Sequence, residues 1–263
     1  MSTRVQVLVA ATNCDPRQLL QKMNIKTDAV IGIQCDENKT EHFNWNGFDI
    51  DCYSFAERGV GLNRNTAMMR AKAEFCIIAD DDVRYLDGYA EEIEKAFDQN
   101  PKADVILFNI TAPKRKLYTI EKKHGISRKN YMRYGAVRIA FRRESVHRNG
   151  ISFNLSFGGG AKYSHGEDTL FLSDCVNKGL NIIALPITLG ELTDSRDSTW
   201  FNGFDDRYFY DQGALYAAIS RKTHFFLCLQ DVIRHKKKYS SHGGIFKNLT
   251  MMREGARKFF KNN

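Results

Sequence analysis

Short runs of apolar, often β-branched residues recur along the chain, and each has the length of a single strand. They predict seven strands, at Val5–Ala10, Ala29–Gln34, Phe48–Tyr53, Phe75–Ala79, Asp104–Ile110, Val137–Phe141 and Asn181–Ile187. Between them, apolar residues at helical spacing predict helices over Pro16–Met23, Leu62–Lys72, Leu86–Phe97 and Asp168–Lys178. Because strands and helices alternate over residues 1–110, we expect an α/β fold with a mostly parallel central sheet flanked by helices.

A different pattern occupies residues 232–263. This segment holds nine Lys or Arg residues and one acidic residue, Glu254, and therefore carries the whole net charge of +8. From Gly244 onward, apolar residues recur at spacings of three and four, which predicts an amphipathic helix. Two interpretations stay open: the apolar stripe packs against the rest of the chain, or it lies on an anionic membrane. Both can hold if the helix packs by its apolar face and the basic cluster at 234–238 meets the lipid. We divide the chain into a body, residues 1–231, and this basic helical tail.

Cysteine use and hydropathy exclude several classes of protein. The six cysteines are scattered, with no CxxC or CxxH pair, so the sequence supports neither a disulfide scaffold nor a zinc site. The longest apolar runs are far shorter than the roughly 20 residues that a membrane-spanning helix needs, and the first residues contain no hydrophobic signal region. We expect a cytoplasmic protein, and the basic tail leaves peripheral attachment to the inner face of the membrane open.

Three consecutive aspartates, Asp80, Asp81 and Asp82, follow the apolar run at 75–79. Carboxylates about 4–6 Å apart repel one another by roughly 1–4 kcal/mol per pair, so the group is costly unless a cation binds to it. Alternation along a strand lets Asp80 and Asp82 share one side, where their oxygens suit Mg²⁺ or Mn²⁺ together with substrate phosphates. The alternative is a solvated acidic turn or a helix N-cap, although an N-cap needs only one carboxylate.

A second acidic pair, Glu167 and Asp168, opens the last predicted helix, after a glycine-rich stretch at 157–166. One interpretation makes Asp168 a general base at the rim of the sheet, reached through a flexible loop of three glycines. The other is structural, because the helix dipole stabilises acidic residues in a first turn by about 0.3–1 kcal/mol. His165, next to this pair, either tunes Asp168 or is simply exposed.

Polar residues also follow two other predicted strands, Thr12 after the first and Asp36 after the second. In parallel sheets, ligands bind at the carboxyl ends of the strands, so we expect these residues and the three aspartates on one functional rim. The stretch at 111–135 contains eight Lys or Arg residues and one Glu, which is typical of a long basic loop.

Four blocks of the sequence, taken in order, resemble bacterial family 2 glycosyltransferases of the GT-A fold. They are VQVLVAATN, QCDEN, GLNRNTAMMRAKAEFCIIADDDVRY and GGGAKYSHGEDTLFLSDCVNKG, and they lie within residues 4–190. The resemblance implies an inverting enzyme with a divalent metal, Mn²⁺ or Mg²⁺, and a nucleotide-sugar donor, for which a UDP-sugar is the first expectation. It also implies transfer to a hydroxyl of a saccharide or lipid-linked acceptor, in the synthesis of a surface polysaccharide or glycolipid.

The resemblance further implies roles for the residues of the donor side. Asp82, with Asp80 beside it, would hold the metal, and Asp80 or Asp81 would bind the ribose and a metal-bound water. Arg64, in the helix before the aspartates, would lie near the donor. These residues belong to a nucleotide-sugar half of the body, about residues 1–110.

Other roles implied by the resemblance complete the site. Asp36 would contact the nucleobase, with Thr12 also in the nucleotide-sugar site, and Asp168 would take the proton of the acceptor hydroxyl. Acceptor contacts are expected from the second half of the body, about residues 111–231. The candidates there for acceptor contacts are His165, Glu167 and Trp200.

Two other classes of function stay open on the sequence. A metal-dependent nucleotidyltransferase would also need an acidic strand end and a glycine-rich loop, although the GxxxxGKS/T motif is missing. Such an enzyme releases pyrophosphate, whereas glycosyl transfer releases a nucleoside diphosphate. A non-enzymatic nucleic-acid-binding protein would use the basic tail and its aromatic residues, but that function leaves the three aspartates unexplained. We therefore expect no nucleic acid partner.

Overall fold

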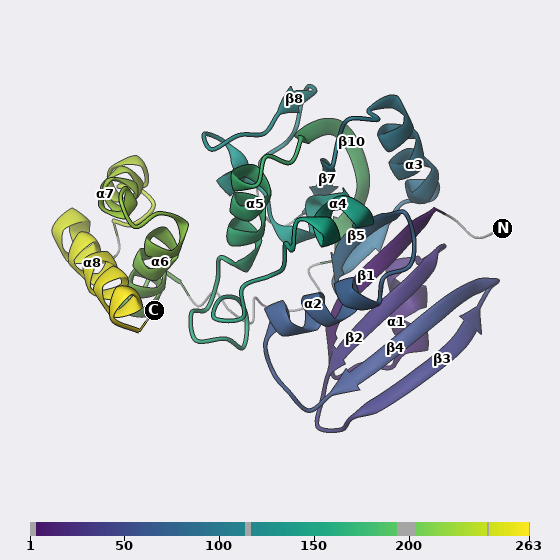
Figure 1. The fold of residues 1–263 in the computed structure, drawn as a ribbon. Coiled ribbons are helices and arrows are strands. Elements are labelled where there is room, and N and C mark those ends of the chain that lie inside the picture. The colour runs from purple at the N-terminus through teal and green to yellow at the C-terminus, as the bar shows by residue number, and fades with distance from the viewer. Residues whose placement is uncertain (1–3, 114–116, 194–202, 241, 263) are drawn as a thin grey trace.

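The structure is a computed structural model that describes residues 4–113, 117–193, 203–240 and 242–262 (Figure 1). The strands are β1 (Val5–Thr12), β2 (Asp28–Gln34), β3 (Lys39–Trp45), β4 (Phe48–Phe55), β5 (Phe75–Asp80), β6 (Val83–Tyr85), β7 (Val105–Thr111), β8 (His124–Gly125), β9 (Ile139–Arg142) and β10 (Ile182–Leu192). The helices are α1 (Pro16–Met23), α2 (Val60–Arg70), α3 (Tyr89–Gln99), α4 (Arg143–Arg148), α5 (Glu167–Asn177), α6 (Asp206–Ile219), α7 (His224–Arg234) and α8 (Gly244–Asn262).

Within the described residues, all strands join one sheet, in the order β3-β4-β2-β1-β5-β9-β7-β10-β6, with β8 paired to β10. The centre is parallel, because β1 pairs in parallel with both β2 and β5, and β2 with β4. The strand β9 runs antiparallel between β5 and β7. The predicted α/β fold with a mostly parallel central sheet is confirmed.

Helices cover both faces of the central strands. Leu19 of α1 and Ile93 of α3 share one buried cluster with Val7 of β1, whereas Met68 of α2 and Phe171 of α5 belong to a second cluster on the other face. Because β1 is covered on both sides, its side chains are buried from residue 5 to residue 11. This explains why the sequence there is almost continuously apolar and does not alternate. The one polar residue, Gln6, is buried and accepts hydrogen bonds from the backbone N–H groups of Lys72 and Ala73.

Three helices at the C-terminal end, α6, α7 and α8, form a unit beside the sheet, which we call the helical unit (Figure 1). The helices α6 and α8 touch along their backbones. A Cβ atom at Gly213 would lie 1.9 Å from the carbonyl oxygen of Met252, and one at Gly255 would lie 1.9 Å from that of Tyr210. The apolar stripe of α8 therefore packs against the rest of the protein. Among the described residues, the protein has no helix that is both long and apolar enough to cross a membrane.

Replacing Gly213 with Ala is expected to destabilise the protein, since its new methyl group would overlap the backbone of α8 on a rigid helix. Overpacking of this kind costs about 1–3 kcal/mol, and about 2–4 °C of Tm is lost per kcal/mol in a chain of this size. The loss of Tm is measured by thermal unfolding. Gly125→Ala is the matched control, because a Cβ there meets open space at a φ that any residue adopts. Equal Tm values for the two variants would contradict this packing.

Candidate active site

The carboxyl ends of β1, β2 and β5 lie at one edge of the sheet, as the register of the parallel pairs requires. Ala10 of β1 lies opposite Asp80 of β5, and Thr12 lies opposite Gln34 of β2. The backbone N–H of Thr12 donates to Oδ2 of Asp81 at 3.3 Å, which ties the two strand ends together. The structure thus brings Thr12 and the three aspartates to the same rim.

The three aspartates point to different neighbours. Asp80, whose side chain is 37% exposed, accepts a hydrogen bond from Arg64. Asp81 is buried and accepts from the N–H of Thr12. The half-buried Asp82 is fixed through its carbonyl oxygen, to which the N–H of Thr193 donates at 2.8 Å. In the described part of the chain, no three His, Cys, Asp or Glu residues gather as a ready-made metal cage.

Arg64 joins the aspartates to the second acidic pair. Its Nη2 donates to Oδ1 of Asp80 and its Nη1 donates to Oε1 of Glu167, both at 2.7 Å. Only 4% of the side chain is exposed, and its guanidinium lies 5.3 Å from the ring centre of Phe153. Burial alone would lower the pKa of Arg64, but the charges of Asp80 and Glu167 hold it above its ordinary value. We call this bridge the Arg64 clamp.

Asp168 lies next to the clamp, in the first turn of α5. Its Oδ1 accepts from the N–H of Thr169 at 2.7 Å, and its Oδ2 lies 3.6 Å from where a Cβ atom of Gly135 would be. Burial, together with the neighbouring charge of Glu167, raises the pKa of Asp168 to about 7, against the opposing effect of Arg64. A carboxylate with this pKa can accept a proton near neutral pH, which is what a general base requires.

The glycine-rich stretch before α5 is packed against α2. The N–H of Val60 donates to the carbonyl of Gly159 at 2.9 Å. A Cβ atom on Gly158, whose φ is +102°, would lie 2.6 Å from Val60 and 2.8 Å from the carboxylate of Glu167. Only glycine permits this approach without strain. The three glycines predict a flexible loop here, whereas the stretch fits closely between α2 and Glu167.

His165 contacts the helical unit. Its Nε2 lies 2.9 Å from Oε1 of Gln212, and its ring stacks on that of Tyr208 with centres 5.0 Å apart. The backbone N–H of Ser164 donates to Oδ2 of Asp211 at 2.9 Å. The segment that leads to Asp168 is thus fixed by α6.

Asp36 lies farther out on the rim, with 94% of its side chain exposed, and pairs with Nη2 of Arg58 at 2.5 Å. Arg58 also donates to the carbonyl oxygen of Cys35. Trp200, expected on the acceptor side, lies outside the described residues.

Three further residues contact the strands of this site in positions that the sequence pattern does not predict. Lys22 of α1 donates through Nζ to the carbonyl oxygen of Asp81 at 3.2 Å. Asn63 of α2 is buried and donates to the carbonyl oxygen of Gly32 at 2.9 Å, inside the sheet. Thr193 holds the backbone of Asp82 from the end of β10. Asn63 adjoins Arg64 in a helix whose other buried residues are mostly small or apolar, and that polar pair is the signal available in the sequence.

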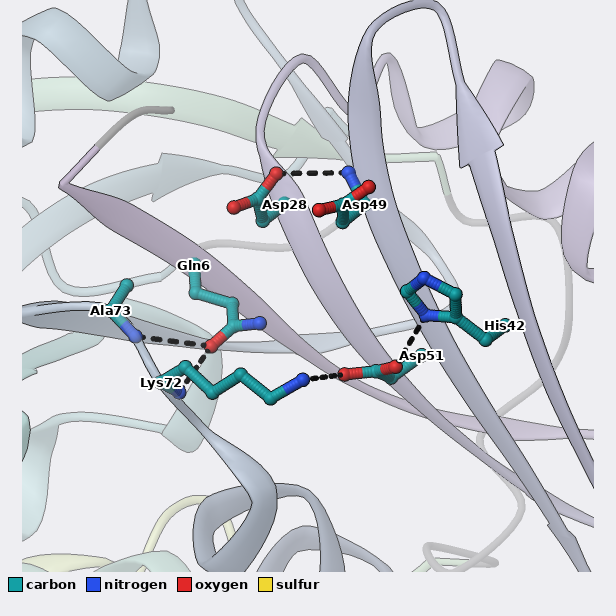
Figure 2. Close-up of a pocket in the computed structure, with 7 residues that line it drawn as sticks. All are labelled: Gln6, Asp28, His42, Asp49, Asp51, Lys72 and Ala73. Atoms are coloured by element: carbon teal, nitrogen blue, oxygen red, sulfur yellow. Dashed lines mark hydrogen bonds and ion pairs between the residues drawn. The ribbon is translucent and has the colours of Figure 1, made fainter. Parts of the chain in front are cut away.

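A hollow of about 170 Å³ lies at the opposite edge of the sheet (Figure 2). In it, Asp51 is paired with Lys72 at 2.9 Å and with His42 at 2.7 Å. Burial alone would raise the pKa of Asp51, but these two partners hold it below its ordinary value. Asp28 and Asp49 also line the hollow, near the amino ends of β2 and β4. In sheets of this type, ligands bind at the carboxyl ends of the strands, so we place the active site at the other edge.

The sequence of residues 36–156 matches the family described as Glycosyl transferase family 2. The fold is that of solved glycosyltransferases. Residues 36–156 therefore carry a family 2 glycosyltransferase domain. S. aureus TarS 1–349 in complex with UDP-GlcNAc superposes with a TM-score of 0.66 at 15% identity, covering 92% of this chain and 75% of that one. The mannosyltransferase PcManGT from Pyrobaculum calidifontis, in complex with GDP-Man and Mn²⁺, gives a TM-score of 0.53 at 14% identity, covering 100% of this chain and 76% of that one.

No curated protein matches the sequence of this glycosyltransferase. The family match includes Arg64 and the three aspartates but ends before Glu167 and Asp168. The expectation that Asp168 is the general base therefore depends on its position beside the Arg64 clamp and on its raised pKa. The family match over residues 36–156, together with the fold, confirms the expected enzyme class, a glycosyltransferase.

Proposed function

We propose that the protein is a metal-dependent inverting glycosyltransferase. It would move a sugar from a nucleotide-diphosphate sugar, in the first place a UDP-sugar, to a hydroxyl of a saccharide or lipid-linked acceptor in the synthesis of a surface polysaccharide or glycolipid. One observation carries the proposal: the Arg64 clamp joins the acidic end of β5 to the first turn of α5, where Asp168 has a pKa of about 7. An acidic strand end and a base of suitable pKa are thereby held at one edge of the sheet.

The chemistry of inverting transfer needs both parts of this site. The departing diphosphate gains negative charge in the transition state, and the attacking hydroxyl loses its proton. Asp168 is the proposed base for that proton. As the base takes the proton, the hydroxyl oxygen forms a bond to the anomeric carbon and the diphosphate leaves from the opposite face. This single displacement inverts the configuration without a covalent intermediate.

The donor set of the rim fits a divalent cation. Mg²⁺ is usually bound through one or two carboxylates plus substrate phosphates, not in a cage made by the protein alone. Asp82 is half-buried at the rim and Asp80 is partly exposed, which supports them as the ligands. A bound Mn²⁺ or Mg²⁺ would supply positive charge beside the diphosphate. The presence of Mn²⁺ and GDP-Man with PcManGT supports the same assignment.

Other residues are assigned around the donor and the acceptor. We propose that Thr12, Asp36 and Asp81 contact the nucleotide, and that Arg64 acts as a positioning residue, because both of its terminal nitrogens are engaged. UDP-GlcNAc in TarS supports a UDP-sugar as the first donor to test. On the acceptor side, Gly135 lies against Asp168 and brings the end of the basic segment 111–135 to the base. Three further acceptor-side residues belong to the proposal: Glu167, His165 and Trp200.

Asp82→Asn is expected to weaken the binding of UDP in the presence of Mn²⁺ at least tenfold. Loss of a residue that merely supports a metal ligand already costs about 10–100-fold in metal affinity, and a charged ligand should cost no less. Titration calorimetry of UDP with Mn²⁺, and again with excess chelator, measures the effect. Asp98→Asn is the matched control, since Asp98 is exposed and pairs with Arg4 away from the rim. UDP binding by the original protein that is as tight in chelator as with Mn²⁺, or Mn²⁺-dependent binding that Asp82→Asn leaves unchanged, would contradict the metal site.

A further inference from the structure

The outer face of α7 carries apolar side chains that nothing in the described structure covers. The helix buries one face through Cys228 and Val232. On the opposite side Phe226 and Ile233, two turns apart, are 68% and 58% exposed. Single exposed apolar residues are common on protein surfaces, but a helix that displays a large side chain at each end of one face exposes a patch.

The patch continues onto α8. The guanidinium of Arg253 lies 5.8 Å from the ring centre of Phe225, which places α8 beside the start of α7. Phe246, 87% exposed, precedes Arg253 by seven residues and therefore lies on the same side of α8. The two helices lie at the outer side of the helical unit, and α6 lies nearer the sheet (Figure 1). We call this surface, defined by Phe225, Phe226, Ile233, Phe246 and Arg253, the outer face.

The segment that carries the outer face is strongly basic. Residues 221–262 contain eleven Lys or Arg and two acidic residues, Asp231 and Glu254. Asp231 is buried and pairs with Nδ1 of His235 at 2.6 Å, so Glu254 is the exposed acid of the segment. Three consecutive exposed lysines, Lys236 to Lys238, follow directly after α7. Aromatic and aliphatic side chains bordered by Lys and Arg are the composition that binds the interface of an anionic lipid bilayer.

We infer that the outer face docks the protein on an anionic membrane. The charge favours lipid head groups, and an exposed Ile beside Phe favours the boundary with the acyl chains over a nucleic acid, which aliphatic side chains do not recognise by stacking. The apolar stripe of α8 plays a different part from the one in the sequence-based alternative: it packs on α6, and the lipid-facing residues lie on α7 and on the other side of α8. The docking itself does not rest on the proposed function. Only the idea that docking brings the active site to a lipid-linked acceptor rests on it.

Docking through this face would also fix the active site relative to the lipid. The helix α6 joins the helical unit to the segment before Asp168, through Asp211 with Ser164 and Gln212 with His165. Phe259 of α8 packs against Phe157 of the same segment, with ring centres 6.0 Å apart. These direct contacts would keep the acceptor side of the active site in a fixed position relative to a membrane bound at α7 and α8.

Co-sedimentation with vesicles of phosphatidylcholine, with and without phosphatidylglycerol, tests the inference on the full chain. Each basic residue near an anionic surface contributes about 1 kcal/mol, so changing Lys236, Lys237 and Lys238 to Gln should weaken binding to the anionic vesicles about 100-fold. The matched control changes the same charge elsewhere, at the exposed Lys95, Lys102 and Lys122. That variant should bind almost as the original protein does.

A second variant tests the apolar part. Phe226→Ser with Ile233→Ser should lower binding to anionic vesicles while leaving the thermal unfolding temperature unchanged, because both side chains are mostly exposed. Equal loss in the two lysine variants, or binding equally strong to neutral and anionic vesicles, would overturn the inference. A dimer that the serine variant dissolves, with vesicle binding intact, would show that the outer face joins two copies of the chain. The assay contains neither donor nor metal, so its failure would leave the proposed glycosyl transfer untouched.

Discussion

Replacement of Asp168 by Asn is expected to lower kcat of sugar transfer by about 10²–10⁴-fold, the usual contribution of a general base. Asn is nearly isosteric and can keep the hydrogen bond from the N–H of Thr169, but it cannot accept a proton from an attacking hydroxyl. The binding of UDP with Mn²⁺ should therefore be retained, and the loss should appear in kcat. Initial rates of UDP release from UDP-sugars with acceptor measure it. A variant with near-normal kcat would return Asp168 to a structural role.

The pH dependence separates a base from a merely structural residue. Since the pKa of Asp168 is raised to about 7, kcat/KM should rise with pH and level off above about pH 7. Glu167 raises that pKa, so Glu167→Gln should move the rising limb to lower pH. A limb that stays in place would contradict the assignment of Asp168 as the group that titrates.

The thermal stability of Asp168→Asn provides a control, because this substitution should raise Tm while it lowers activity. The folded state raises the pKa of Asp168 above its ordinary value of 3.8, so the folded protein favours the neutral acid. This contribution to stability is fully present below pH 3.8 and is lost as the pH rises toward 7. Asp168→Asn should therefore increase Tm at pH 8, by about 2–4 °C if it recovers 1 kcal/mol, and by less at pH 5. A variant that melts early would have lost activity through unfolding.

Arg64→Met should destabilise the protein by about 3–5 kcal/mol, the cost of removing one partner from a buried ion pair. Met keeps much of the length of the side chain but leaves Asp80 and the 12%-exposed Glu167 without their shared cation. Arg64→Lys should also lower the stability, because a single ammonium group cannot replace the two terminal nitrogens with which the guanidinium bonds two carboxylates. Urea unfolding followed by circular dichroism measures the loss.

A surface pair provides the comparison for Arg64. Lys26 pairs with Asp87 at 2.6 Å, but both side chains are more than half exposed. Lys26→Met should cost at most about 1 kcal/mol, since exposed pairs contribute little. If Arg64→Met were no more destabilising than Lys26→Met, the Arg64 clamp would not contribute to the stability of the fold.

The sequence predicted the centre of the sheet well because its strands are covered on both faces. The runs at 5–10, 29–34 and 75–79 each lie inside an observed strand. The helix expected over Pro16–Met23 has those bounds, since Asp15 caps it and Pro16 starts it. Elements at the margin were not anticipated. The edge strand β3 is mostly polar, with Phe43 and Trp45 toward its end, and β6 is three residues long, so neither carries an apolar run.

The helical unit shows a second limit of sequence patterns. We predicted α8 from its spacing, but α6 and α7 were not anticipated. In α6, buried and polar residues are mixed, because Asp211 and Gln212 bond to the segment before Asp168 and face inward. The start of α7 reads as a plain apolar run, and spacing alone did not show that Phe226 faces outward. The division of the chain at residue 231 remains a prediction; α7 spans that position.

The candidate site was predictable in its residues but not in its connections. Position after a strand selected Thr12 and Asp80 from the sequence, and position at the start of a helix selected Asp168. The Arg64 clamp depends on a contact between residues 103 positions apart, and no local pattern specifies it. The raised pKa of Asp168 likewise comes from burial and from charges that only the folded chain brings together.

The order of synthesis gives the clamp a further consequence. A growing chain folds from its N-terminal end, yet Arg64 gains its second partner only when residue 167 has emerged. The strand β6, directly after the three aspartates, waits longer still, because Val83 pairs with Leu192 of β10. Until β9 has formed, β5 is open along the edge that will pair with it. The acidic end of β5 is therefore synthesised early but takes its final structure late. A nascent chain that stops near residue 110 exposes the unpaired edge of β5, which could pair with a neighbouring chain.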